Sequence, residues 1–133
     1  MNFPTRAGKF VYLWAPVLFY AVFIFFLSSC SFRLPWFGKA QKIHADWAVH
    51  VVEYSVLGLL LARALWWTSP MRHSAGRIFA AALFIGALYG VSDEFHQRFV
   101  PYRDSSPQDL AADTVGVALG TWLWITKQTR LYA

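Results

Sequence analysis

The sequence has few charged residues and a single cysteine, and each shortage excludes classes of protein. Charged residues make up 14% of the 133 residues and hydrophobic residues 57%, which is too apolar for a water-soluble domain of this size. With Cys30 alone, the chain offers no internal disulfide and no cysteine-based zinc site. The net charge of +5 comes from basic residues scattered near the ends of apolar segments, so we expect membrane anchoring and no nucleic-acid partner.

Three common catalytic motifs are also missing. The chain contains no HExxH zinc motif, no Gly-rich phosphate-binding loop and no Gly-x-Ser-x-Gly nucleophile elbow. The sequence therefore identifies no reaction class, and whether the protein is an enzyme stays open.

Four apolar runs are long enough to cross a bilayer, which takes about 20 helical residues. They cover residues 10–31, 46–67, 76–95 and 108–127. Segments rich in Pro, Gly and Ser separate them, and Pro16 lies inside the first run, where neighbouring helices can accommodate a proline. We therefore expect one all-α domain over residues 1–133, an integral membrane bundle of four antiparallel helices.

The basic residues favour one orientation of this bundle. Seven of the 12 Lys and Arg residues fall on the side of the two chain ends, so the positive-inside rule predicts that both termini are cytoplasmic in a multi-pass protein of the bacterial cytoplasmic membrane. The acidic residues all fall on the opposite, outer side: Asp46, Glu53, Asp93, Glu94, Asp104, Asp109 and Asp113. Three of the four histidines, His44, His50 and His96, lie there too. The sequence thus predicts a polar pocket at the outer face.

Helical spacing brings several of these side chains together on the second expected helix. His50, Glu53 and Tyr54 share one face, because residues three and four apart are neighbours on a helix. A carboxylate at the centre of a membrane helix costs about 2.5 to 3.5 kcal/mol on insertion scales. We therefore expect Glu53 to point into the bundle.

The third and fourth helices carry similar patterns. On the third, Asp93, His96 and Gln97 share a face, and Glu94 is rotated by about 100° from Asp93. On the fourth, Asp109 and Asp113 continue into two glycines at the same spacing. The small residues expected to let helices pack closely are Gly86, Gly90, Gly116 and Gly120.

Some of these residues have simpler interpretations. Asp46 and Asp109 also suit the N-terminal caps of the second and fourth helices, and Asp104 suits a solvated loop. His44 and His73 suit the membrane interface. The stretch "FLSSC" resembles a lipoprotein signal with Cys30 acylated, although a membrane helix that ends in small residues has the same pattern.

Two longer stretches carry a family resemblance: "DWAVHVVEYSVLGLLL" and "YGVSDEFHQRFVPYRDSSPQDLAADTVGVALG". Together they resemble the VanZ-like family of small bacterial membrane proteins over residues 46–120. The founding member of that family is associated with resistance to the glycopeptide teicoplanin. The positions that match are Asp46, His50, Glu53, Tyr54, Asp93, Glu94, His96, Gln97, Pro101, Arg103, Asp109, Asp113 and Gly116. Trp47, Tyr102 and Asp113 depart from residues common in the family, and Asp113 adds a carboxylate.

One functional hypothesis is a membrane-embedded enzyme that acts on a lipid or a lipid-linked envelope precursor. The expected catalytic residues are His50, Glu53, Asp93, Glu94 and His96, with His50 or His96 as general base and Glu94 as its partner. The expected substrate contacts are Tyr54, Gln97, Arg103, Asp109 and Asp113, with Arg103 binding an anionic group. If a divalent metal is the cofactor, the candidate ligands are His50, Glu53, Asp93 and His96.

Two other hypotheses use the same residues. A non-catalytic envelope protein would bind a zwitterionic or peptide-like ligand between Arg103 and the carboxylates and would alter access to the cell surface. A proton-coupled transporter would use the histidine and glutamate residues as a relay, but four short helices suffice for one only in an oligomer.

Overall fold

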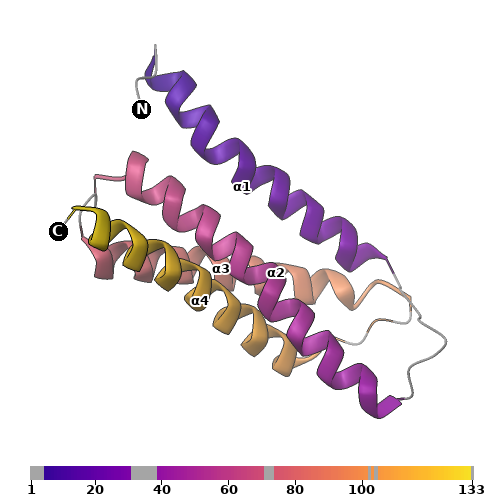
Figure 1. The fold of residues 1–133 in the computed structure, drawn as a ribbon. Coiled ribbons are helices and arrows are strands. Elements are labelled where there is room, and N and C mark those ends of the chain that lie inside the picture. Colours follow the sequence, from indigo (N-terminus) through magenta and orange to yellow (C-terminus); the bar gives the residue numbers. More distant parts are fainter. Residues whose placement is uncertain (1–4, 31–38, 71–73, 102, 104, 133) are drawn as a thin grey trace.

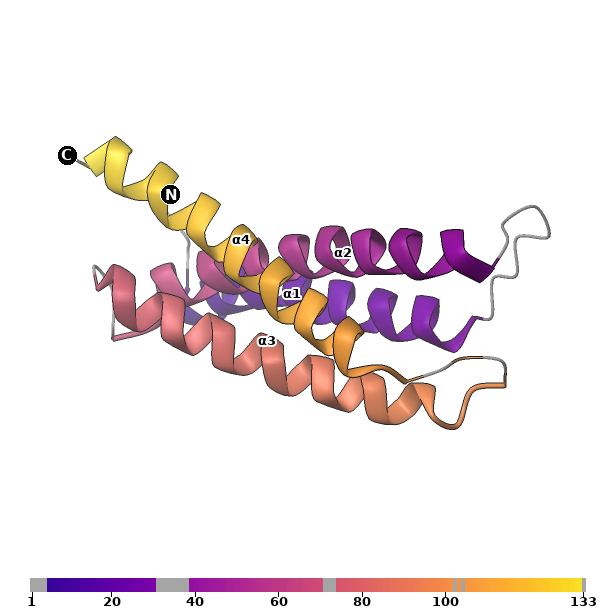
Figure 2. The same ribbon diagram turned by 90° about the horizontal axis from the view of Figure 1, so that it is seen from below.

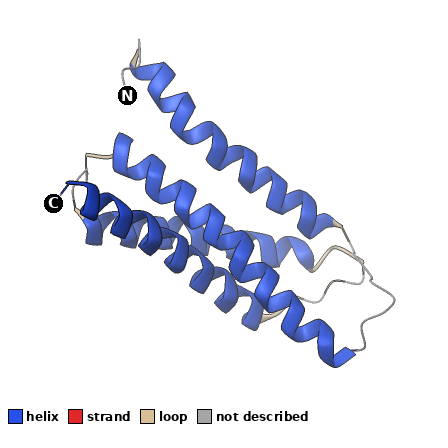
Figure 3. Cartoon of the chain, in the orientation of Figure 1, coloured by secondary structure: helices blue, strands red, loops and turns tan. Residues whose placement is uncertain are grey.

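The computed structural model describes residues 5–30, 39–70, 74–101, 103 and 105–132, with side chains from residue 47 onward in the second helix. Within these ranges the chain forms four α-helices and no strand (Figure 3). They are α1 Arg6–Ser29, α2 Lys39–Thr68, α3 Ala75–Gln97 and α4 Pro107–Tyr132 (Figure 1). Successive helices run in opposite directions, so α1 begins and α4 ends at the same end of the bundle (Figures 1 and 2). The expected all-α antiparallel bundle is confirmed.

The helix boundaries differ from those expected. Helix α1 is continuous through Pro16, as expected. Helix α2 begins at Lys39, seven residues before the expected start, so Asp46 lies inside the helix and the prediction that it caps this helix is wrong. At α4 the Ser106 hydroxyl accepts a hydrogen bond from the Gln108 backbone N–H at 3.1 Å, which makes Ser106 the cap. Asp109 lies in the first turn instead. The predictions for His73, Tyr102 and Asp104, and for the side chains of His44 and Asp46, concern groups outside the described residues.

Three helices of the described chain are long and apolar enough to cross a membrane: Arg6–Ser29, Trp47–Thr68 and Ala75–Gln97. The fourth expected span, over 108–127, is not among them, because this helix carries carboxylates, hydroxyls and glycines along its packed face. On α1 the buried residues form one stripe, Leu13, Val17, Ile24 and Ser28, and the remaining surface is rich in exposed Phe, Leu and Val. Hydrocarbon, unlike water, accommodates such a surface.

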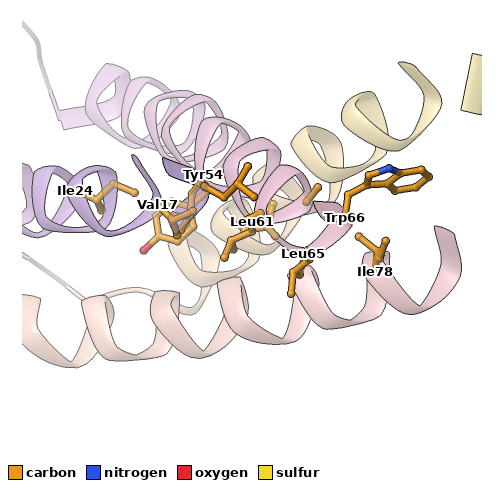
Figure 4. Packing of buried hydrophobic residues seen from close by; sticks show 13 residues of the cluster. Val17, Ile24, Tyr54, Leu61, Leu65, Trp66 and Ile78 are labelled. Carbon is orange, nitrogen blue, oxygen red and sulfur yellow. The ribbon is translucent and has the colours of Figure 1, made fainter. Parts of the chain in front are cut away.

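Helix α2 is central and contacts each of the other three helices. The apolar core lies along it and includes Tyr54, Leu61 and Leu65, with Val17 from α1 and Ile78 from α3 (Figure 4). Tyr54 is completely buried and is the first of these three α2 residues along the chain. It therefore lies where the apolar core meets the polar end of the bundle.

Glycines let α2 and α4 approach closely. A methyl group at Gly58 would overlap the backbone oxygen of Val117, and one at Gly120 would overlap the backbone oxygen of Ser55. A methyl group at Gly116 would lie 2.6 Å from the carbonyl oxygen of Val51. The expectation that Gly116 and Gly120 serve helix packing is therefore confirmed, and this packing fixes the position of the preceding turns of α4.

Candidate functional site

Polar side chains converge where α1 and α3 end and α4 begins. This end of the bundle lies away from the two termini (Figures 1 and 2). We call this group the polar cluster: Ser28, Ser29, His50, Glu53, Tyr54, Asp93, Glu94, His96, Gln97, Arg103, Asp109 and Asp113. Four of its ionisable residues are almost inaccessible, with exposed fractions of 6% for His50, 2% for Asp93, 6% for Glu94 and 0% for Asp113, and Ser28, Tyr54 and Gln97 are buried beside them. Burial of this many ionisable groups requires compensating partners.

A buried ion pair joins α2 to α4. His50 Nδ1 lies 2.8 Å from Asp113 Oδ1. Asp113 fits because Gly90 of α3 faces it, and a methyl group at Gly90 would lie 3.1 Å from Asp113 Oδ2. No described group forms a hydrogen bond with that second oxygen, although it is buried. The pair therefore leaves one carboxylate oxygen with unused bonding capacity.

Glu94 approaches the same point from α3. Its Oε2 accepts a hydrogen bond from the Ser106 backbone N–H at 2.8 Å, which ties the end of α3 to the start of α4. Its Oε1 is buried and has no hydrogen-bond partner in the described part of the chain. One donor atom each from His50, Glu94 and Asp113 lies within 4.8 Å of the other two. Two carboxylates and one imidazole thus face a common point.

Asp93 turns toward α1. Its Oδ2 accepts hydrogen bonds from Ser28 Oγ at 2.7 Å and from Gln97 Nε2 at 2.9 Å. The bond from Gln97 follows the spacing that the sequence predicted. Within the described ranges Oδ1 of Asp93 has no hydrogen-bond partner, and it is buried.

Arg103 closes the end of α1. Its Nη2 donates to the carbonyl oxygens of Leu27 at 3.1 Å and Cys30 at 3.2 Å. The Cys30 carbonyl belongs to the residue that caps α1, and the Leu27 carbonyl also accepts the Cys30 backbone N–H. The Nε group is buried and finds no acceptor among the described residues. Half-buried Glu53 interacts electrostatically with His50, Asp93 and Arg103, so it belongs to the same charged environment.

The remaining cluster residues surround these groups. His96 Nε2 lies 3.0 Å from Ser29 Oγ, and its ring centroid lies 4.3 Å from that of Phe25, so His96 faces α1. Asp109 is half-buried and interacts electrostatically with His50. The Tyr54 ring stacks on His50 with centroids 6.5 Å apart, and its buried hydroxyl has no hydrogen-bond partner in the described chain.

The structure divides the residues predicted as metal ligands. Of His50, Glu53, Asp93 and His96, only His50 belongs to the group of converging donor atoms found among the described residues. The other two members are Glu94 and Asp113. The rotation of about 100° between neighbouring helical residues explains the division, because it turns Asp93 toward α1 and Glu94 toward α4.

Three polar contacts come from serines that no sequence pattern marks as functional. Ser28 and Ser29 are small residues near the end of the first apolar run, and in the structure they contact Asp93 and His96. Ser106 precedes Pro107, and a serine followed by proline is a pattern typical of helix starts. That pattern could have identified the α4 cap, although not the bond to Glu94.

Comparison with known proteins tests the resemblance. The family model described as VanZ/LLP1 matches residues 8–128, which is nearly the whole chain and includes every residue of the polar cluster. No curated protein and no solved structure matches the chain. The chain belongs to the VanZ/LLP1 family.

Proposed function

We propose that this protein is a multi-pass protein of the bacterial cytoplasmic membrane, with both termini in the cytoplasm, that binds a zwitterionic phospholipid headgroup at its outer face. The headgroup would carry a phosphate and a primary amine. The observation that supports this proposal most strongly is a pair of opposite charges beside the last turn of α1. Asp93 Oδ1 and Arg103 Nε are both buried there, and neither has a hydrogen-bond partner within the described residues.

The energetic argument concerns unsatisfied charges. A buried polar group without a partner costs about 1 to 3 kcal/mol, and more when it is charged. A primary ammonium has three N–H donors, which suit Asp93 Oδ1 and the neighbouring Glu53 carboxylate. A phosphate has acceptor oxygens that suit the guanidinium of Arg103. One zwitterionic headgroup therefore satisfies both sides of the pair, whereas a purely anionic headgroup satisfies one.

The surroundings of the pair favour recognition. Asp93 is held by Ser28 and Gln97, and Arg103 is held by two backbone carbonyls, so both charges are oriented before a ligand arrives. Such preorganisation lowers the entropic cost of binding. Binding of an abundant headgroup at the outer leaflet would alter the cell surface, which gives a route to an effect on teicoplanin susceptibility.

Lipid binding by the purified protein tests the proposal. In detergent, phosphatidylethanolamine should bind more tightly than phosphatidylglycerol, which lacks the amine, when both are titrated and followed by native mass spectrometry. Asp93→Asn should weaken phosphatidylethanolamine binding by about tenfold or more, since a hydrogen bond to a charged group contributes about 1.5 to 3 kcal/mol. Arg103→Gln should weaken binding of both lipids.

The matched control is Arg98→Gln, which removes an exposed arginine at the end of α3. It should leave both affinities unchanged. Equal binding of the two lipids, with no effect of Asp93→Asn in a folded protein, would refute headgroup recognition by this pair. Retention of a lipid-linked precursor in place of phospholipid would replace the proposed ligand.

A further inference from the structure

We infer that His50, Glu94 and Asp113 form a binding site for a divalent transition metal ion of the zinc type, between α2, α3 and α4. The inference does not rest on lipid binding, because these three residues differ from those assigned to the headgroup. It begins from the three donor atoms that lie within 4.8 Å of one another, all from buried residues.

The donor separations suit a tetrahedral ion. Bonds of about 2.1 Å at tetrahedral angles place two ligand atoms about 3.4 Å apart. His50 Nδ1 and Asp113 Oδ1 lie 2.8 Å apart, and no separation within the group of three exceeds 4.8 Å. Side-chain movements of about 1 Å therefore convert the observed arrangement into a coordination shell, with the ion in place of the proton shared by His50 and Asp113.

Unused oxygens provide an independent argument for a cation. Asp113 Oδ2 and Glu94 Oε1 are buried in residues that are 0% and 6% exposed, and no described group forms a hydrogen bond with either atom. A histidine that ligates a metal is neutral, so in the metal-bound state the charge of the two carboxylates would have no balance from His50 in a region of low dielectric constant, where unpaired charge is costly. A divalent cation balances that charge, and carboxylate oxygens without a hydrogen-bond partner are the kind of ligand it binds.

The donor types select the metal. Imidazole nitrogen together with carboxylate oxygen suits Zn²⁺ and its neighbours in the first transition row, whereas Ca²⁺ and Mg²⁺ prefer six or more oxygen ligands. Three protein ligands leave the fourth tetrahedral position for water or a ligand oxygen, as in catalytic zinc sites. The Ser106 backbone N–H on Glu94 Oε2 is the kind of outer contact that orients a ligating carboxylate.

Metal titration of the purified protein in detergent tests this site. After treatment with chelator, calorimetry with Zn²⁺ and elemental analysis should give one ion per chain, and Mg²⁺ should not compete. Because the three ligands come from three helices, Zn²⁺ should also raise the melting temperature of the protein. Co²⁺ bound at the site should show the visible absorption of a tetrahedral nitrogen and oxygen complex.

Substitutions distinguish the three proposed ligands from the other histidines and carboxylates of the polar cluster. Glu94→Gln and Asp113→Asn should each weaken Zn²⁺ binding by about 100-fold, since changes outside the ligand shell alone cost about 10- to 100-fold. His96→Ala should leave one tight ion per chain, because His96 faces α1. Circular dichroism of each chelated variant establishes that it is folded, and Glu94→Gln keeps an acceptor for Ser106 if Asp113→Asn fails to fold. Weak binding of several ions that the ligand variants do not change, or loss of the ion in His96→Ala alone, would overturn the inference.

Discussion

Helices α2 and α4 approach so closely at Gly120 that there is no room for an added methyl group. It would overlap the backbone oxygen of Ser55 and lie 2.9 Å from the backbone nitrogen of Leu59. Because both neighbours are backbone atoms, no change of rotamer relieves the overlap and the helices must separate. Overpacking of this kind costs about 1 to 3 kcal/mol, against a gain of about 0.5 to 1 kcal/mol from alanine's helix propensity. Because the overlap is with backbone atoms, the upper end of the cost applies, and we expect Gly120→Ala to destabilise the bundle by about 2 to 2.5 kcal/mol.

Gly76→Ala is the matched control for this substitution. Gly76 is exposed in the first turn of α3, and nothing lies within 4 Å of an added methyl group, so only the gain in propensity applies. Unfolding in mixed micelles with increasing dodecyl sulfate, followed by tryptophan fluorescence, measures both variants. Gly120→Ala should unfold at a lower denaturant fraction than the wild type, and Gly76→Ala at an equal or higher one. Equal midpoints for Gly120→Ala and the wild type would refute the close approach of the two helices.

Three further predictions concern the polar cluster, its orientation and the cell surface. Ser28→Ala should destabilise the protein by about 1 to 3 kcal/mol in the same unfolding assay, because it removes a hydrogen-bond donor to buried Asp93. Ser29→Ala, at an exposed position, should destabilise it less. A larger effect of Ser29→Ala than of Ser28→Ala would contradict the assigned contacts. In a cysteine-free background, a cysteine at Ser105 should react with an impermeant thiol reagent added outside cells and one at Thr5 should not, and labelling of both from one side would refute the proposed topology. Expression of the wild type, but not of Asp93→Asn at equal abundance, should raise the teicoplanin concentration needed to inhibit growth, and identical concentrations would exclude this role.

Much of the fold could be predicted because its signals are local. Apolar runs of about 20 residues predict the number of helices, although only three of the four are apolar enough to cross a membrane. Alternation of helices predicts that the acidic residues lie at one end. Spacing along a single helix was enough to predict that Asp93 and Gln97 share a face, and the structure shows a hydrogen bond between them. The early start of α2 at Lys39 could not be predicted, because its first turns carry polar residues that do not continue the apolar run.

The composition of the candidate site depends on contacts between helices, which a single sequence does not encode locally. Whether Asp93 or Glu94 meets His50 depends on how α3 is rotated against α2 and α4, and glycine contacts such as that at Gly90 set this rotation. Likewise, the bonds from Arg103 to the end of α1 join segments more than 70 residues apart. Such pairings follow from the packing of the helices. The sequence therefore predicts which residues join the cluster better than it predicts which residues each of them contacts.

The lipids that co-purify with the protein from native membranes test most directly whether it recognises a zwitterionic headgroup. Wild-type protein and Asp93→Asn, extracted with a membrane-solubilising polymer without detergent, would be compared by quantitative lipid mass spectrometry against the bulk membrane. Headgroup recognition predicts that the wild type retains an amine-bearing zwitterionic phospholipid in excess over the bulk composition, and that Asp93→Asn loses this excess. A lipid composition equal to the bulk membrane for both proteins would contradict the account.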